Sequence, residues 1–381
     1  MAKYLFGDIV REIKEKVDRD NNPYDYFIAG DHMDTDELHL LRRGLFEGSD
    51  VGPAFIRVFK PGQVLYGSRR TYLRKVAVAD FEGVTANTTF VLESKDESIL
   101  LQSLLPFIMQ SDRFVQHSIK RSKGSTNPYV LFSDLADYEV DLPDIHEQKR
   151  LSEVLWAIDS VKMSYKRLIS ATDDLVKSQF IEMFGMIDAT SLCNMAKVSA
   201  GQSSPYDEEF SATGTPFIKA GDLESLKKRV ISENDCNLVD NETIIRRKLK
   251  LHGKGTVLVA KSGMSCLSGH VYALKEPAYI VSHLACIEPI EGKSTTEYLR
   301  WLFITCGIKD LIKDPSYPSI QLSQLNELQI PNASYSKQLE FSSFASQSDK
   351  SKFAAAKCSN LNLSSGLVVR LKMKKSGSRQ K

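Results

Sequence analysis

The sequence predicts an α+β fold of two similar domains, separated by long antiparallel coiled-coil helices and related by a pseudo-two-fold internal repeat. Three observations lead to this prediction. Segments in the second half of the 381 residues repeat segments of the first, each half combines short strand patterns with an amphipathic helix, and a long heptad pattern lies between the halves. At about 100–200 residues per domain, the length also fits two domains with connectors.

The repeat has an offset of about 190 residues, which is half the chain and too long for a solenoid or propeller period. Gly62-Gln63-Val64-Leu65 is followed in the second half by Gly255-Thr256-Val257-Leu258. Five further residues recur at a displacement of 190, and these are Pro128, Ser133, Leu135, Gln148 and Asp159, matched by Pro318, Ser323, Leu325, Gln338 and Asp349. Order and spacing together indicate a duplication.

Each copy has the same succession of elements. Alternating apolar and polar residues between glycine turns, such as Lys75-Val76-Ala77-Val78-Ala79-Asp80, predict short strands. An amphipathic stretch follows each strand set, at residues 99–118 and 296–312. We therefore expect a first domain over residues 1–143 and a second over residues 186–331.

Between the domains, residues 144–185 predict one long spacer helix. Asp144 precedes Glu147 by three residues, as in a capping box, and Gly185 follows the last helical residue as a C-cap does. At ~1.5 Å per residue such a helix would span roughly 60 Å. Its apolar positions recur in heptads, which predicts a coiled-coil stripe of Leu151, Val154, Ile158, Val161, Tyr165, Leu168 and Leu175. A long core helix of an ordinary domain is the alternative.

A shorter copy of this helix is expected over residues 332–360, with Phe341 and Phe344 on the same stripe. Two helices that each expose an apolar stripe would pair with each other. The heptad pattern is absent from residues 361–381, which form an atypical basic tail. Its composition resembles that of replaced or out-of-frame sequence. A DNA-binding tail is the alternative interpretation.

Composition limits the possible functions. The net charge of +2 requires any nucleic-acid site to be a local basic patch. No stretch has the ~18 consecutive apolar residues of a membrane span, and the start of the chain has no signal-peptide pattern, so we expect a cytoplasmic protein that makes no membrane contact. The six cysteines are far apart, which favours small buried residues over disulfides or metal ligands.

Motifs for catalysis are incomplete. Asn127-Pro128-Tyr129 lacks the second proline of the adenine methyltransferase loop, and no glycine-rich turn for a nucleotide or S-adenosylmethionine accompanies it. Asp144 and Glu147 lie closer together than a nuclease metal motif requires. The seven histidines form no close ligand pair on one helix face, so no metal site is expected.

The strongest family similarity lies in the residues that flank the long helix. Leu142-Pro143-Asp144-Ile145-His146-Glu147-Gln148-Lys149-Arg150-Leu151 leads into a helix that finishes with Phe180-Ile181-Glu182-Met183-Phe184-Gly185. Gly124-Ser125-Thr126-Asn127-Pro128 and its echo Pro315-Ser316-Tyr317-Pro318-Ser319 add to this pattern. In these motifs and in its alternation of two domains with two spacers, nearly the whole chain resembles the specificity subunits of type I restriction-modification enzymes.

The resemblance implies a non-catalytic DNA-binding subunit of a bacterial defence system that methylates DNA. Each target-recognition domain would read one half of an interrupted double-stranded DNA target, while the paired helices would fix the gap and dock two methylation subunits. Restriction and translocation subunits would join through the methylation subunits. S-adenosylmethionine, ATP and Mg²⁺ would belong to these partners, so no cofactor is expected in this chain. The shortened second spacer puts docking of one methylation subunit in doubt.

Sequence-specific DNA binding needs side chains that bond base edges, together with cations that contact phosphates. We expect the loops at Arg69 and Lys261, which follow equivalent strands, to enter the groove. The full set of candidate DNA-binding residues is Arg69, Arg70, Tyr72, Arg74, Lys75, Lys120, Arg121, Lys123, Lys219, Arg246, Arg247, Lys248, Lys261 and Ser262. Two other functions remain open: a helical scaffold that reads no sequence, and a self-contained DNA methyltransferase or nuclease.

Overall fold

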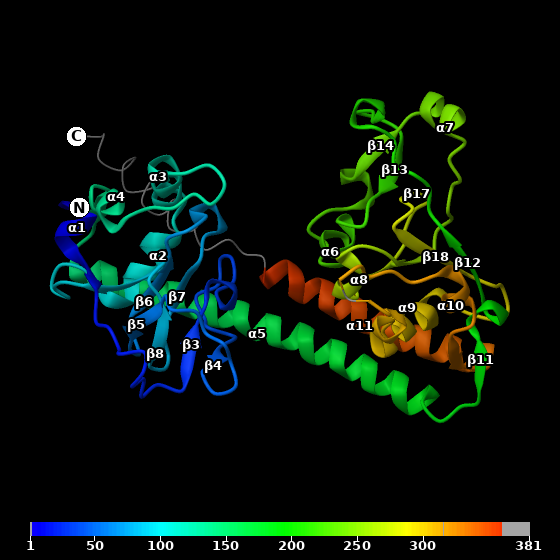
Figure 1. Cartoon of the computed structure of the whole chain (residues 1–381), viewed down its shortest axis with the longest axis horizontal. Helices are drawn as coiled ribbons and strands as arrows, with labels where there is room; N and C mark the ends of the chain where they lie inside the picture. Colours follow the sequence, from blue (N-terminus) through cyan, green and yellow to red (C-terminus); the bar gives the residue numbers. More distant parts are fainter. Residues whose placement is uncertain (1, 315, 360–381) are drawn as a thin grey trace, which may run out of the picture. The chain divides into compact units, whose positions relative to one another are not determined.

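The computed structural model describes residues 2–314 and 316–359 (Figure 1). The chain forms two compact units, the first ending at Ser164 and the second running from Tyr165 to Cys358. Helix α5 (Ile145–Phe184) contributes its first half to the first unit and its second half to the second. The basic tail expected at residues 361–381 lies outside the described residues.

The first unit contains two four-stranded sheets, with strand orders β2-β9-β6-β7 and β4-β3-β8-β5, and a two-stranded sheet of β1 and β10. Its strands are β1 (Ala2–Leu5), β2 (Val10–Ile13), β3 (Tyr26–Ile28), β4 (Gly44–Leu45), β5 (Phe55–Phe59), β6 (Val64–Gly67), β7 (Val76–Val78), β8 (Gly83–Ala86), β9 (Thr89–Ser94) and β10 (Glu139–Leu142). Its helices before α5 are α1 (Phe6–Ile9), α2 (Leu105–Gln110), α3 (Asp112–Arg121) and α4 (Phe132–Ala136).

The second unit contains a four-stranded sheet in the order β12-β18-β15-β16, a three-stranded sheet in the order β14-β13-β17, and a two-stranded sheet of β11 and β19. Its strands are β11 (Ala189–Ser191), β12 (Ala196–Ala200), β13 (Thr215–Ile218), β14 (Asn237–Val239), β15 (Val257–Ala260), β16 (Val271–Ala273), β17 (Tyr279–Ile280), β18 (Leu284–Pro289) and β19 (Gln329–Pro331). Its helices after α5 are α6 (Asp222–Lys227), α7 (Asn241–Arg247), α8 (Ser265–Ser268), α9 (Thr296–Cys306), α10 (Leu322–Asn326) and α11 (Tyr335–Ser359).

The two units share their topology. The order β2-β9-β6-β7 corresponds to β12-β18-β15-β16, and β4-β3-β8 corresponds to β14-β13-β17. The central pairs β3 with β8 and β13 with β17 are both parallel, whereas the other strand pairs given for these two sheet types are antiparallel. The predicted α+β class with an internal repeat is therefore confirmed.

A buried glutamine connects each spacer helix to its unit in the same way. The Gln148 amide donates to the carbonyls of Ile99 at 2.8 Å and Pro143 at 3.0 Å, and its oxygen accepts from Leu101 N at 3.1 Å. In the second unit the Gln338 amide donates to Lys293 O at 2.9 Å and Ala333 O at 2.8 Å, and accepts from Thr295 N at 2.9 Å. We call these the glutamine clamps. They show that the duplication extends to individual hydrogen bonds.

Helix α5 begins at the predicted capping residue, since Asp144 Oδ1 accepts from Glu147 N at 2.9 Å. This backbone hydrogen bond lowers the pKa of Asp144. The Glu147 carboxylate lies 3.6 Å from the Arg150 guanidinium.

Among the described residues, no helix combines the length and hydropathy that a bilayer crossing requires.

Within the second unit, α11 runs antiparallel beside the second half of α5 (Figure 1). The Phe341 ring lies 5.3 Å from the Phe180 ring and 5.5 Å from the Phe184 ring. Further along, Lys352 Nζ lies 2.6 Å from the Asp173 carboxylate. As α11 proceeds from Phe341 to Lys352, its partners on α5 therefore run back from Phe184 and Phe180 to Asp173.

Candidate nucleic-acid interface

The structure brings the two basic segments of the first unit together. Arg70 N donates to Pro128 O at 2.6 Å, and Val130 N donates to Ser68 O at 3.0 Å. Lys123 and Tyr129 exchange backbone hydrogen bonds of 2.8 and 2.9 Å. Residues 68–75, which follow β6, and residues 120–130, at and after the end of α3, therefore form one surface. We call these two segments the first basic loop pair.

Tyr129 lies at the centre of this surface and was not among the residues selected from the sequence. The Arg69 guanidinium lies 5.9 Å from the centroid of its ring, and the ring is partly exposed. An aromatic residue after Pro128 is the available signal, but sequence reasoning uses Tyr129 only as part of an incomplete methyltransferase motif.

The predicted cations of the first unit differ in availability. Arg69, Arg70, Tyr72 and Lys120 are exposed, and the three cations among them make no ion pair with the described residues. Arg70 also adopts a left-handed backbone conformation with φ of 50°, which is unusual for a side chain of this size and turns the chain at the loop.

The other four cations are engaged within the unit. Arg74 binds the carboxylates of Asp36 at 2.6 Å and Asp112 at 2.8 Å. Burial alone would lower the pKa of Arg74, but these two carboxylates outweigh it and raise the pKa. The remaining three bind acceptors of the same unit: Lys75 bonds the carbonyl of Gly30, Arg121 bonds Asp137, and Lys123 bonds Asp134 at 2.7 Å.

The loop at Lys261 occupies the equivalent place in the second unit. Gly263 N donates to Pro318 O at 3.0 Å, and Ile320 N donates to Lys261 O at 2.7 Å. These bonds match Arg70 to Pro128 and Val130 to Ser68, so that Lys261, Ser262 and Gly263 stand where Ser68, Arg69 and Arg70 stand in the first unit. We call residues 261–263 and 316–320 the second loop pair.

Side chains of the two loop pairs are chemically different. The second pair presents Ser262, whose hydroxyl lies 2.8 Å from His283 Nδ1, together with the half-buried Lys261. Tyr317 beside it is 83% exposed. The backbone framework is therefore shared, while the arginines of the first pair have no counterpart at the same positions of the second.

Two of the remaining predicted cations of the second unit, Arg246 and Arg247, bind Glu209. Arg246 Nη2 donates to Glu209 Oε1 at 2.7 Å, and Arg247 also bonds Glu209; the bond from Arg247 is the main cause of the lowered pKa of Glu209. Lys219 Nζ lies 4.5 Å from the Phe210 ring centroid, and Lys248 is exposed. Figure 1 shows α7, which supplies both arginines, at the opposite end of this unit from α9 and α11.

The predicted coiled-coil stripe of α5 is largely exposed. Only Leu151 among its seven residues is buried, and Tyr165 is half-buried. The face of α5 that packs on the units instead contains Leu155 and Met163 in the first unit and Val176, Phe180 and Phe184 in the second. On α11, Phe341 is fully buried and Phe344 partly buried against the same core. The exposed stripe residues are Val154, Ile158, Val161, Leu168 and Leu175, with exposed fractions of 36–56%.

Metal-ligand spacing occurs at one group of described side chains, formed by Glu37, His39 and Asp159 of the first unit. The described cysteine side chains form no such group: Cys236, Cys266 and Cys286 are buried, whereas Cys193 and Cys306 are exposed. The expectation that all cysteines are buried is thus wrong for these two.

Comparison with known proteins identifies a family. The family model of the type I restriction modification DNA specificity domain matches residues 11–170 and 189–360. The type I restriction enzyme MjaIX specificity subunit of Methanocaldococcus jannaschii is 24% identical over 285 residues, which cover 69% of this chain and 63% of that protein. The HindI specificity subunit of Haemophilus influenzae is 23% identical over 190 residues, which cover 47% and 40%. The chain spans less than two thirds of the length of these two relatives.

Among solved structures, the S subunit of a type I restriction-modification system from M. genitalium is similar over 97% of this chain and 94% of its own. The TM-score is 0.53 at 14% sequence identity, so this similarity concerns the fold.

Proposed function

The chain belongs to the family of type I restriction-modification DNA specificity domains, and from this premise we propose that it selects the DNA sequence on which a type I complex acts. Each α+β domain reads one half of a bipartite, interrupted target. Helices α5 and α11 together form the spacer and dock two methylation subunits. The chain itself performs no chemistry: S-adenosylmethionine, ATP and Mg²⁺ are bound by the methylation subunits and by the restriction subunits that join through them, in the cytoplasm where the DNA lies.

The observation on which this proposal chiefly rests is the repeated loop pair with exchanged side chains. Both domains hold the end of a central strand against a proline-containing loop by equivalent backbone bonds. Arg69 and Arg70 occupy positions that Ser262 and Gly263 occupy in the second domain. Because arginine bonds guanine edges and serine bonds several bases, one framework would read two different half-sites.

The ion pairs of the predicted cations indicate which of these side chains can contact DNA. Arg69, Arg70 and Lys120 can reach a phosphate or a base without first breaking an ion pair to any residue that the structure describes. Arg74 would have to give up two carboxylates, so we assign it to holding the loop in place. In the second domain, Lys261, Ser262 and Lys248 are the corresponding candidates, while Arg246 and Arg247 are shared with Glu209.

The exposed stripe of α5 supports the docking part of the proposal. Contiguous exposed apolar side chains on a protein usually mark an interaction surface. Val154, Ile158 and Val161 belong to the first unit, and Leu168 and Leu175 to the second, so each unit offers an apolar patch for a methylation subunit.

DNA binding by the complex with its methylation subunits tests the proposal. Arg69→Ala with Arg70→Ala should weaken specific binding, and the slope of log affinity against log salt should fall by about 1 for each of the two arginines that contacts a phosphate. Lys60→Ala is the matched control, since Lys60 is an exposed cation that precedes β6, at the other end of that strand.

Mapping of methylated adenines separates the alternatives. The Arg70→Ala variant should relax one half of the target and leave the other half unchanged. Unaltered affinity and an unaltered target would remove the first basic loop pair from DNA recognition. If the wild-type complex bound DNA without sequence preference, the scaffold function would replace this proposal, and methyl transfer by the isolated chain would favour the enzyme.

A further inference from the structure

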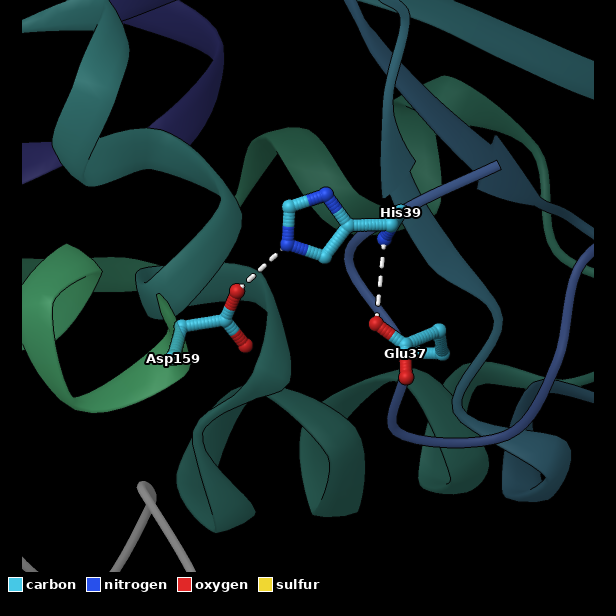
Figure 2. Close-up of side chains that lie close together, drawn as sticks. All are labelled: Glu37, His39 and Asp159. Carbon is cyan, nitrogen blue, oxygen red and sulfur yellow. Dashed lines mark hydrogen bonds and ion pairs between the residues drawn. The ribbon is translucent and has the colours of Figure 1, made fainter. Parts of the chain in front are cut away.

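A buried group of ionisable side chains joins a loop of the first unit to α5. Glu37 and His39 lie in the segment that follows β3, and Asp159 lies 120 residues later on α5. One potential ligand atom from each of the three lies within 4.8 Å of the others. Figure 2 shows the two carboxylates flanking His39.

Asp159 is the unusual member of this group. Its side chain is fully buried; Oδ2 lies 2.6 Å from His39 Nε2, while the buried Oδ1 has no hydrogen-bond partner among the residues that the structure describes. Glu37 is also buried and its Oε1 accepts from His39 N at 3.3 Å. A buried carboxylate oxygen without a partner is costly, because it has lost water and gained nothing in exchange.

In the second copy of the domain, the equivalent carboxylate is compensated by two cations. Asp349 is the counterpart of Asp159, and it binds Arg300 at 2.8 Å and Lys352 at 2.6 Å. In the first copy, Lys162 corresponds to Lys352, but it donates to the carbonyl of Asp36 at 2.8 Å instead. The glutamine clamps align Ile99 with Lys293, which places Pro106 opposite Arg300. Asp159 therefore lacks both of the cations that its counterpart has.

We propose that Glu37, His39 and Asp159 bind a divalent transition-metal ion of the Zn²⁺ class, which compensates the buried carboxylate of Asp159. One imidazole nitrogen and two carboxylates suit such an ion, whereas Mg²⁺ and Ca²⁺ prefer oxygen ligands only. In the tetrahedral arrangement that Zn²⁺ favours, bonds of about 2.0–2.2 Å place two ligand atoms about 3.3–3.6 Å apart. Binding would therefore draw the more widely spaced ligand atoms together and would move His39 Nε2 and Asp159 Oδ2 apart from their 2.6 Å contact. The side chain of His39, 41% exposed, leaves a path for the ion and for a water as fourth ligand.

Binding would replace a hydrogen bond by three metal bonds. The proton shared by His39 and Asp159 passes to solvent when the ion binds. The ion would fix the loop to α5, and through Asp36 the ordering would extend to Arg74 in the first basic loop pair. This differs from the expectation of no metal site, which considered only ligands close together in sequence.

Metal binding by the full chain tests the inference. Purified protein is stripped of metal and titrated with Zn²⁺ by calorimetry and with Co²⁺ by visible absorption, above neutral pH so that protons compete less. We expect one ion per chain and a rise in Tm of about 5–10 °C when the ion is at 100 times its dissociation constant. Glu37→Gln, His39→Ala and Asp159→Asn should each weaken binding at least tenfold.

Two further variants separate a metal site from a structural ion pair. The glutamine of His39→Gln can still donate a hydrogen bond to Asp159 but is a poor metal ligand. This variant should therefore keep the fold and lose the ion. His117→Ala removes another histidine paired with an aspartate, at 3.1 Å from Asp137, and should bind as the wild type does. The inference is wrong if the wild type binds no stoichiometric ion, if His39→Gln binds normally, or if Co²⁺ spectra show thiolate ligation by the exposed Cys193 or Cys306. If another variant fails to fold, the test relies on His39→Gln, and circular dichroism verifies that this variant is folded.

Discussion

Removal of the Phe341 ring should detach α11 from α5. The side chain is fully buried, and its ring packs on both Phe180 and Phe184 within the core of the second unit. Truncation of a buried phenylalanine to alanine costs about 3–5 kcal/mol, because contacts are lost and a cavity remains. With a urea dependence of ~2 kcal/mol per molar, the unfolding midpoint of this unit should fall by about 2 M.

The two tryptophans allow this unit to be followed alone. Trp156 lies in the first unit, and Trp301 is 1% exposed in the core of the second. In a Trp156→Phe background, the fluorescence of Trp301 therefore reports unfolding of the second unit. Leu339→Ala is the control on the same helix; Leu339 is 50% exposed, so its truncation should cost only about 1 kcal/mol.

The result can refute the described packing. A midpoint shift below ~0.5 M for Phe341→Ala would correspond to a loss of less than about 1 kcal/mol. So small a loss is incompatible with a buried ring that packs on both Phe180 and Phe184. An equal effect of both substitutions would mean that α11 does not present Phe341 to α5. In either case the second spacer would not be a docked helix.

Three further perturbations follow from the same contacts. Leu168→Asp with Leu175→Asp places charges on the exposed stripe of α5; the chain should remain folded but lose at least tenfold affinity for a methylation subunit in surface plasmon resonance, whereas Ser170→Asp, at an exposed position of α5 outside the stripe, should not. Gln338→Ala removes three buried hydrogen bonds and should destabilise the second unit by about 2–4 kcal/mol in the Trp301 assay; no measurable loss would contradict the clamp. For Asp349, burial would raise the pKa, but its two cationic partners outweigh burial and lower it from 3.8. A lowered folded-state pKa stabilises above the unfolded value, so Asp349→Asn should destabilise the second unit at neutral pH, and its difference from the wild type should shrink as the pH falls below 3.8.

Local sequence signals account for the fold class, but not for the buried face of the long helix. Asp144 and Gly185 mark helix ends through interactions within a few residues, and the matched residues of the repeat reveal the duplication. Heptad spacing marks an apolar stripe on α5 but does not say what covers it, and five of its seven residues are exposed in the structure. In the structure the face toward the units includes polar Gln148 and Asp159, which hydrophobic periodicity scores against.

Contacts between distant segments explain what sequence reasoning missed at the site. The first basic loop pair joins Arg70 to Pro128, and the proposed metal ligands join His39 to Asp159. Nothing in the spacing of such residues marks them as neighbours until the sheet is assembled. Charge runs in the sequence also did not distinguish an available cation such as Lys120 from Arg74, which two carboxylates already occupy.

The duplicated domain separates what must be retained from what can change. The hydrogen bonds shared by both copies have backbone atoms on one side or on both, as in the glutamine clamps and the loop pairs, so they tolerate substitution of the neighbouring side chains. The side chains presented by the loops differ between the copies, and so does the compensation of Asp159 and Asp349. A framework held mainly by backbone hydrogen bonds can thus change its loop chemistry without losing the fold, and two copies joined by one helix can come to recognise different sequences.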